Sequence, residues 1–211
     1  MKKYFALLIL TFFLVQGISQ SANSEILIAA ADETSNMENE LVEANKKFKY
    51  KGKLIHPGCV EQFNASLADS GPPVIRAVDV ESCVNNNEFT EDFKVNDDGY
   101  IVYEYGEEGE NKFFGYKYIG KASGGLHVLD TISSGGGTMV AKTIFLTRFG
   151  LENYKSFDDE GKINIEKRLI MKFIGQIIRG DRDVGKVELK DNEILLGESQ
   201  YRKKMEVIHL D

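Results

Sequence analysis

The chain has 211 residues, of which 42% are hydrophobic, and its formal net charge is −7 from 26 basic and 33 acidic side chains. This length and hydrophobic content suffice for one domain with a sizeable core. The acidic balance excludes nucleic acid and anionic membrane surfaces as favoured partners, and the sequence contains no basic run or RNA-binding signature. A partner with a basic surface would be attracted instead.

The N-terminus predicts an exported protein. Residues 1–3 carry two lysines, residues 4–15 are almost wholly apolar, and small and polar residues follow. This is the layout of a secretory signal peptide, and the apolar run is too short to cross a bilayer as a helix. A retained N-terminal anchor is the alternative. We predict a periplasmic or secreted protein with no stable membrane insertion after signal cleavage.

The chain divides into three segments on this interpretation. Residues 1–22 are the predicted signal peptide, residues 23–45 are a polar leader or a short helix, and residues 46–211 are a β domain. No Pro/Gly-rich linker and no internal repeat divides the third segment. We therefore expect one folded domain.

Two cysteines, Cys59 and Cys83, are the only ones in the chain. An oxidising compartment favours their pairing in a disulfide, whereas two free buried thiols are the alternative. No Cys-x-x-Cys or His-x-x-x-His spacing accompanies them, so the sequence predicts no zinc site.

Strand signals dominate the β domain, and turn residues recur at short intervals. This pattern predicts an all-β fold, a single antiparallel β-sandwich or flattened barrel of about eight strands. The first strand is expected at residues 49–55. A short helix with apolar spacing of four is expected at residues 59–67, and a strand at residues 74–83.

A predicted hairpin pairs residues 100–105 with residues 112–119 across a charged turn that contains Glu107. Its aromatic side chains alternate, so they gather on one face if the two arms are in register. They could form half of the core, or a surface that stacks on a glycan or anchors a protein partner. These side chains are Tyr103, Tyr105, Phe114, Tyr116 and Tyr118.

A second hairpin contains three successive glycines, Gly135, Gly136 and Gly137. A phosphate-binding loop would need glycine before Lys142, where this chain has Ala141, and no helix signal follows. We therefore predict a hairpin turn and no nucleotide or other cofactor. A ligand or partner backbone lying close to the glycines is the functional alternative.

Residues 163–178 fit both a helical period and a strand period. Their isoleucine content, Gly175 and the strand-rich surroundings favour a strand. Closing strands are expected at residues 184–189, 194–196 and 204–210.

Few residue patterns indicate chemistry. Loops centred on Gly99 and Gly161 lack the glutamate of a calcium-binding EF-hand, so no metal site is predicted. No Gly-x-Ser-x-Gly motif is present. The best constellation for a hydrolase is His127 with Asp130, joined by Asp181 or Asp183. His127 and Asp130 differ in parity, so they would not share a strand face.

The segment Ala122-Ser123-Gly124-Gly125-Leu126 resembles the Ser-Gly-containing loop of periplasmic lysozyme inhibitors. The tyrosine that follows in that family is absent, since Leu126 and His127 stand in its region. The resemblance implies a small exported β-protein that blocks a basic cell-wall hydrolase through Ser123 and Gly124.

From the sequence we predict an exported, non-enzymatic binding protein of the bacterial envelope, with a protein or glycan partner. Inhibition of a basic cell-wall hydrolase is one alternative, and a hydrolase with a His/Asp site is another. The sequence does not specify the oligomeric state.

Overall fold

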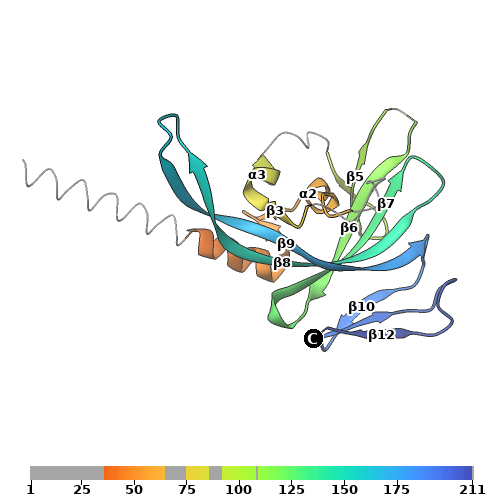
Figure 1. The fold of residues 1–211 in the computed structure, drawn as a ribbon. Coiled ribbons are helices and arrows are strands. Elements are labelled where there is room, and N and C mark those ends of the chain that lie inside the picture. Colours follow the sequence, from red (N-terminus) through yellow and green to blue (C-terminus); the bar gives the residue numbers. More distant parts are fainter. Residues whose placement is uncertain (1–35, 65–74, 86–91, 108, 211) are drawn as a thin grey trace, which may run out of the picture. The chain divides into compact units, whose positions relative to one another are not determined.

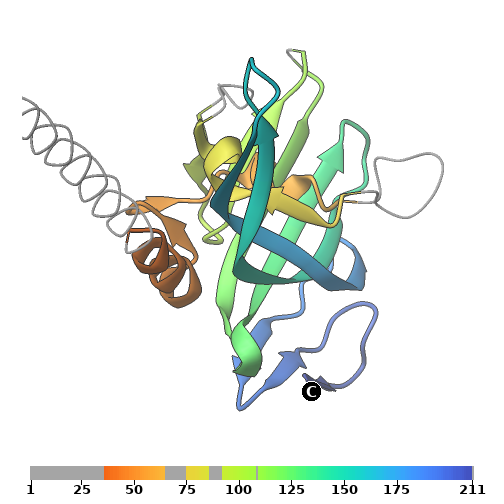
Figure 2. The same cartoon turned by 60° about the vertical axis from the view of Figure 1, so that its left-hand side comes forward.

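A computed structural model describes residues 36–64, 75–85, 92–107 and 109–210. The predicted signal peptide and most of the polar leader lie outside the described residues. Residues 40–211 form a unit of their own. Its framework is a seven-stranded antiparallel sheet in the order β3-β9-β8-β7-β6-β5-β4 (Figures 1 and 2). The strands are β3 (Ala77–Asp79), β4 (Lys94–Val95), β5 (Ile101–Tyr105), β6 (Lys112–Lys121), β7 (Leu126–Gly135), β8 (Ala141–Phe157) and β9 (Ile163–Asp181).

One face of the sheet, the inner face, is covered by short elements from the first part of the chain. These are the helical residues 40–47, the hairpin of β1 (Lys49–Tyr50) and β2 (Lys53–Leu54), and the helices α2 (Pro57–Glu61) and α3 (Val80–Asn85). Their apolar side chains pack with those of the sheet in the larger core. Its largest fully buried side chains are Tyr50, Tyr116, Phe48, Phe63, Phe114, Phe145, Ile55, Leu129, Leu169 and Met171.

The opposite, outer face carries a second layer. It is an antiparallel sheet of β10 (Val187–Lys190), β11 (Glu193–Leu196) and β12 (Glu206–His209), which lies across β8 and β9 from α2 and α3 in Figure 1. A second core joins Val128 and Ile144 of the large sheet to Ile194 and Leu196. The predicted all-β, sandwich-like fold is confirmed.

Strand β7 shows why the large sheet needs cover on both faces. Leu129 of β7 packs in the inner core and Val128 in the outer core, and both are fully buried. Successive side chains of a strand point to opposite faces, so a strand with apolar residues at both parities must lie between two layers. The run Leu126–Ile132 therefore requires a central strand.

The ambiguous segment at residues 163–178 is a strand, as predicted. It pairs with β8 from Phe157↔Ile163 to Ala141↔Asp181, but the register shifts twice. Ile174 and Arg179 are left without partners on β8, which is the arrangement of a β-bulge. Each extra residue reverses which parity faces inward, and this explains why no single period fitted the sequence.

Two local predictions are wrong. Residues 49–55 are not one strand but a hairpin that turns at Lys51 and Gly52, both with positive φ. The predicted strand at residues 74–83 is limited to β3 by Asp79, whose Oδ1 accepts a hydrogen bond from the Ser82 amide at 3.0 Å. This is an N-cap, and it starts α3 where alternation had predicted more strand.

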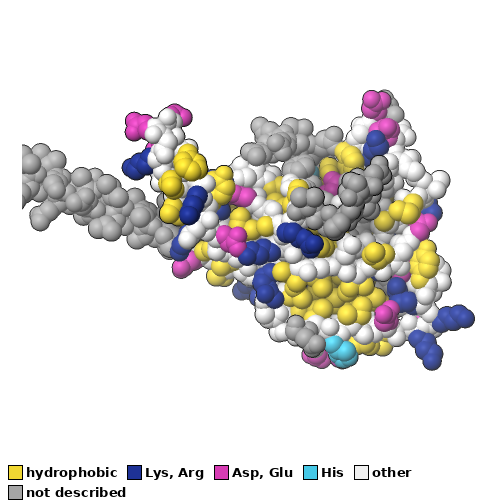
Figure 3. All heavy atoms as spheres, viewed as in Figure 1, with side chains coloured by type: hydrophobic (Ala, Val, Ile, Leu, Met, Phe, Trp, Pro, Cys, Tyr) yellow, Lys and Arg dark blue, Asp and Glu magenta, His cyan; other side chains and the backbone are white. Residues whose placement is uncertain are grey.

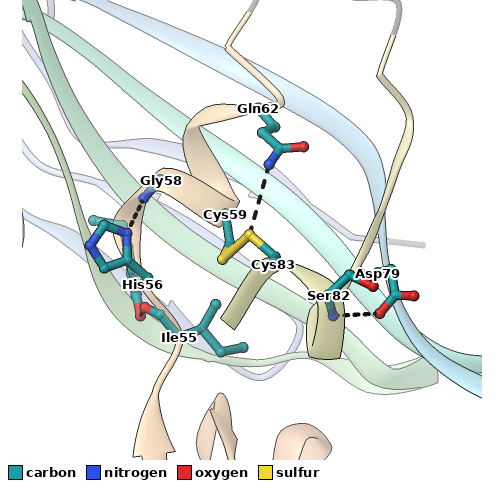
Figure 4. Close-up of a disulfide and its surroundings, with 9 residues drawn as sticks. Ile55, His56, Gly58, Cys59, Gln62, Asp79, Ser82 and Cys83 are labelled. Carbon is teal, nitrogen blue, oxygen red and sulfur yellow. Dashed lines mark hydrogen bonds between the residues drawn. A yellow bond between two sulfur atoms is a disulfide. The ribbon is translucent and has the colours of Figure 1, made fainter. Parts of the chain in front are cut away.

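The disulfide between Cys59 and Cys83 is confirmed, but it joins two helices rather than a strand and a helix (Figure 4). The two Cα atoms lie 5.9 Å apart, within the usual range for a disulfide. Pro57 starts α2, and the His56 ring accepts a hydrogen bond from the Gly58 amide. The predicted helix at residues 59–67 is thus displaced toward the N-terminus, and Leu67 lies outside the described residues.

Strands β8 and β9 extend beyond the rest of the sheet as a two-stranded ribbon (Figure 1). Pairing with β7 ends at Arg148 and pairing with β3 ends at Ile170, so among the described strands the ribbon residues pair only with each other. Its distal part exposes Phe157 and Ile165, at 71% and 61% of their surface. The ribbon therefore carries apolar groups into solvent.

Replacing both cysteines tests the contribution of the disulfide to stability. Cys59→Ala/Cys83→Ala should lower the free energy of unfolding by about 3.5 kcal/mol, because the unfolded chain gains the entropy of an open 24-residue loop. Denaturant titration of both proteins measures the difference. Wild type titrated in a reducing agent should match the variant, and equal midpoints for oxidised wild type and variant would contradict the prediction.

Candidate ligand-binding cleft

A cleft of about 990 Å³ opens on the outer face of the large sheet, beside the segment that leads into β10. One wall comes from β6, β7 and β8, and the other from residues 182–189. In the view of Figure 3, hydrophobic side chains gather at the surface between β9 and β10. The lining includes Tyr100, Ile132, Lys142, Arg179, Val184 and Leu189.

Arg179 is the centre of an ionic network at the floor of the cleft. Its side chain is only 1% exposed, and its two terminal nitrogens bind Asp130 Oδ1 at 2.6 Å and Asp183 Oδ1 at 3.0 Å. Asp183 also pairs with Arg202 through Oδ2, at 2.6 Å. Arg179 faces the same side as Ile177 of the outer core, two residues earlier, because the bulge at Ile174 has reversed the parity of the strand.

Tyr100 and Lys142 connect this network to the cleft. The Tyr100 hydroxyl donates a hydrogen bond to Asp130 Oδ2 at 2.6 Å, and Lys142 Nζ donates to the Tyr100 hydroxyl at 3.1 Å. Lys142 Nζ also lies 4.4 Å from the centre of the Tyr100 ring, which is cation–π distance. A chain of hydrogen bonds therefore runs from Lys142 through Tyr100 to Asp130.

The charges of this group do not cancel. Asp130 and Asp183 are matched by Arg179 and Arg202, which leaves the ammonium of Lys142 in excess. Within the described residues, no carboxylate oxygen lies within 4.0 Å of Lys142 Nζ. Burial lowers the pKa of Lys142, because a half-buried ammonium has lost part of its hydration.

The pKa of Tyr100 shifts in the opposite direction to that of Lys142. Burial raises the pKa of Tyr100, and the negative charge of Asp130 raises it further, so the phenol stays protonated. A protonated phenol can donate to Asp130 and accept from Lys142 at the same time. The polar end of the cleft is therefore fixed by its own hydrogen bonds.

The predicted His/Asp site is not assembled. His127 is fully buried on the inner face of β7, with its ring centre 5.6 Å from that of Phe48 and 5.0 Å from that of Phe149. Asp130 lies on the outer face with Asp183, as the difference in parity predicted. Asp181 binds elsewhere, accepting a hydrogen bond from the Val140 amide.

The aromatic face of the first hairpin is core, so the prediction of a binding surface is wrong for Tyr103 and Tyr116. The arms pair in the expected register, with Tyr103 opposite Phe114, but α2 and its flanking residues cover this face. Tyr105 and Tyr118 are half-buried against the same core. The Tyr103 hydroxyl donates to Glu61, and burial raises the pKa of that carboxyl group.

The two parts of the predicted hydrolase-inhibiting surface lie at opposite ends of β6. Glu107 is in the turn before Lys112, whereas Ser123 and Gly124 follow Lys121. Ser123 is exposed, and its amide donates to Asn192 Oδ1 at 2.6 Å. A single small contact therefore cannot include both parts.

The triple-glycine turn has a structural cause. Gly136 has φ of +94°, and a Cβ atom there would lie 2.8 Å from the Glu110 carbonyl oxygen. A Cβ atom at Gly135 or Gly137 would meet no heavy atom within 4 Å. The close backbone expected at this turn thus belongs to the neighbouring hairpin of the same chain.

Sequence reasoning missed Tyr100, Lys142 and Arg179 as a group. A signal was present for Arg179, which is a charged residue after two isoleucines in a strand-like run. Buried charges are rare unless they are paired, so such a residue indicates carboxylate partners elsewhere in the chain. Which carboxylates these are depends on the strand register and its bulges, and the sequence did not predict the bulges.

Two kinds of feature are absent from the described part of the chain. Among these residues, no group of three or more His, Cys, Asp or Glu side chains is placed to hold a metal ion. No helix in the same residues has both the length and the apolar character needed to cross a membrane.

His127 should make stability sensitive to acid. Burial, with a smaller effect of Lys121, lowers the pKa of His127 from 6.5 to about 4. Above pH 6.5 the ring is neutral in both states, but between pH 6.5 and 4 the unfolded chain takes up the proton first. Wild type should therefore lose about 3 kcal/mol over this interval relative to His127→Phe.

Denaturant titrations of both proteins at several pH values measure this difference. A constant offset between wild type and His127→Phe from pH 7 to 4 would contradict the lowered pKa. The other titrating groups are common to both proteins, so they cancel in the comparison.

Asp130→Asn tests the buried network. The change keeps the shape of the side chain but leaves Arg179 with one carboxylate fewer in a buried site, and it should cost about 3 to 5 kcal/mol of unfolding free energy. Glu188→Gln is the matched control, because its partner Lys186 is largely exposed and the loss should stay below about 1 kcal/mol. Equal losses in chemical denaturation would show that the network is not a buried one.

Comparisons of this chain with protein-family models, curated protein sequences and solved structures find no match. A function can therefore be inferred only from the chemistry of the chain's own residues.

Proposed function

We propose that this protein is an exported, non-enzymatic binding protein of the bacterial envelope, and that the cleft beside β10 is its ligand site. The observation that carries the proposal is the excess cation of Lys142, which lines a cleft of about 990 Å³ and has no carboxylate partner among the described residues. Ligand sites are commonly concave, of this size, and lined by apolar side chains with a few fixed polar groups.

Export is supported by two observations. Residues 1–22 have the composition of a secretory signal peptide. The Cys59–Cys83 disulfide suits an oxidising compartment such as the periplasm or the exterior of the cell. Both observations favour a periplasmic or secreted location.

A binding role without catalysis is supported by the arrangement of the charged groups. Asp130 and Asp183 are engaged by guanidinium groups, and the only histidine of the predicted hydrolase site lies on the other face of β7. The network holds Tyr100 and Lys142 in place, which is the preorganisation that a binding site needs.

The structure changes the balance between the predicted partner classes. Stacking on a glycan depended on exposed tyrosines, and Tyr103 and Tyr116 are buried. The cleft instead suits a small ligand, or a compact group of a partner molecule, with a negative charge for Lys142.

Two matched substitutions test the cleft as the binding site. Val184 lines the cleft and Val95 lies on β4, and both are largely exposed, at 81% and 61%. Val184→Trp should fill part of the cleft at little cost in stability, whereas Val95→Trp should leave it open.

The experiment uses protein purified from the envelope fraction of expressing cells and monitors its backbone amides by NMR. Adding envelope extract should shift the amide signals of residues 182–189, and Val184→Trp should reduce these shifts at least threefold while Val95→Trp retains them. An extract that leaves the cleft signals unchanged, or two variants that behave alike, would overturn the proposal.

A further inference from the structure

The cationic side chains that line the cleft differ in the groups that they pair with or donate hydrogen bonds to. Lys117 Nζ donates to the Asp98 carbonyl oxygen at 2.9 Å, and Arg182 pairs with Asp181 at 3.2 Å. Lys186 pairs with Glu188. Lys142 is different, because its hydrogen-bond partner is the neutral Tyr100 hydroxyl.

The ammonium of Lys142 has donors to spare. A lysine ammonium carries three N–H donors, and one of them is directed to Tyr100. Lys142 lines the cleft, so its other two N–H groups can donate to a ligand there. A ligand group with two acceptor oxygens on one carbon matches them. A carboxylate is such an acceptor.

The net charge of the side chains that line the cleft indicates the charge of the ligand. Five basic and four acidic side chains line the cleft, so its lining has a net charge of +1. A monoanion neutralises this excess. A dianion such as a phosphate monoester would also meet repulsion from Asp98 and Glu188, which line the same cleft.

The rest of the lining indicates what the carboxylate is attached to. Apolar side chains from β6, β7 and β10, and from the segments before β8 and β10, line the same space, and removing hydrocarbon from water at such a surface is favourable. These side chains are Ile119, Ile132, Val140, Val184, Val187 and Leu189.

We propose that the cleft binds a small aliphatic carboxylic acid, with its carboxylate on Lys142 and its hydrocarbon part against these apolar side chains. The inference rests on the proposed function, since it names the ligand class of the same cleft. It assigns charge recognition to one residue, Lys142, and separates it from the structural charges of Arg179, Asp130 and Asp183.

Calorimetric titration with octanoate tests the ligand class, with octylamine, octanol and octyl phosphate as probes of equal chain length. Octanoate should bind at least tenfold more tightly than each of the other three, because only octanoate combines the chain with a single negative charge. Binding of octylamine or octyl phosphate with the affinity of octanoate would overturn the inference, as would no measurable binding of octanoate.

Two lysine variants test the residue. Lys142→Met keeps the length of the side chain and removes its charge, and it should weaken octanoate binding at least tenfold. Lys94→Met removes an exposed lysine outside the cleft, whose ammonium pairs with Glu104, and should change the affinity less than threefold. Equal effects of the two variants would contradict the assignment to Lys142.

Lys142→Met should keep its fold, because the lost ammonium was buried without a counter-ion, and its thermal unfolding serves as the control. The extract experiment and the octanoate experiment can fail separately. Cleft shifts with extract that Val184→Trp abolishes, together with no octanoate binding, would reject the aliphatic acid and keep the binding function. Failure of both would reject the binding site itself.

Discussion

The pairing of β8 with β9 is the constraint on which the rest of the structure depends. Their long ladder joins β3 to the rest of the large sheet and continues into the ribbon, and its two bulges affect which side chains face each core. Without the first bulge, at Ile174, the alternation of Leu169, Met171 and Phe173 would continue, and Arg179 would face the inner core, away from Asp130. A local irregularity of backbone pairing thus determines the electrostatics of the outer face.

Buried charge is costly, and this protein offsets most of that cost within one group of residues. Arg179 satisfies two carboxylates, and Arg202 supplies the second cation that makes their charges balance. Removing one member leaves an uncompensated buried ion, so the network stabilises the fold only while all of its members are present. Lys142 stands outside this balance. A partly buried charge is stabilised by an opposite charge nearby. This stabilises the network, and it favours the binding of an anion from solution to Lys142.

The sequence was sufficient for the fold class because alternation and turn residues are local signals. It predicted the disulfide, the hairpins and the strand at residues 163–178. It failed where a single side chain overrides alternation, as Asp79 does by capping α3. It also failed for the cleft, because Tyr100, Lys142 and Arg179 are 37 or more positions apart and meet only after two bulges fix the register.

The protruding ribbon affects how readily the protein associates with other chains. Two strands with open edges and exposed Phe157 and Ile165 offer a template on which other chains could add strands. Charged side chains alternate with these apolar ones, including Lys155 opposite Ile165 and Glu166 opposite Tyr154. An incoming strand would have to bury these charges, and the cost of their desolvation opposes aggregation along the ribbon.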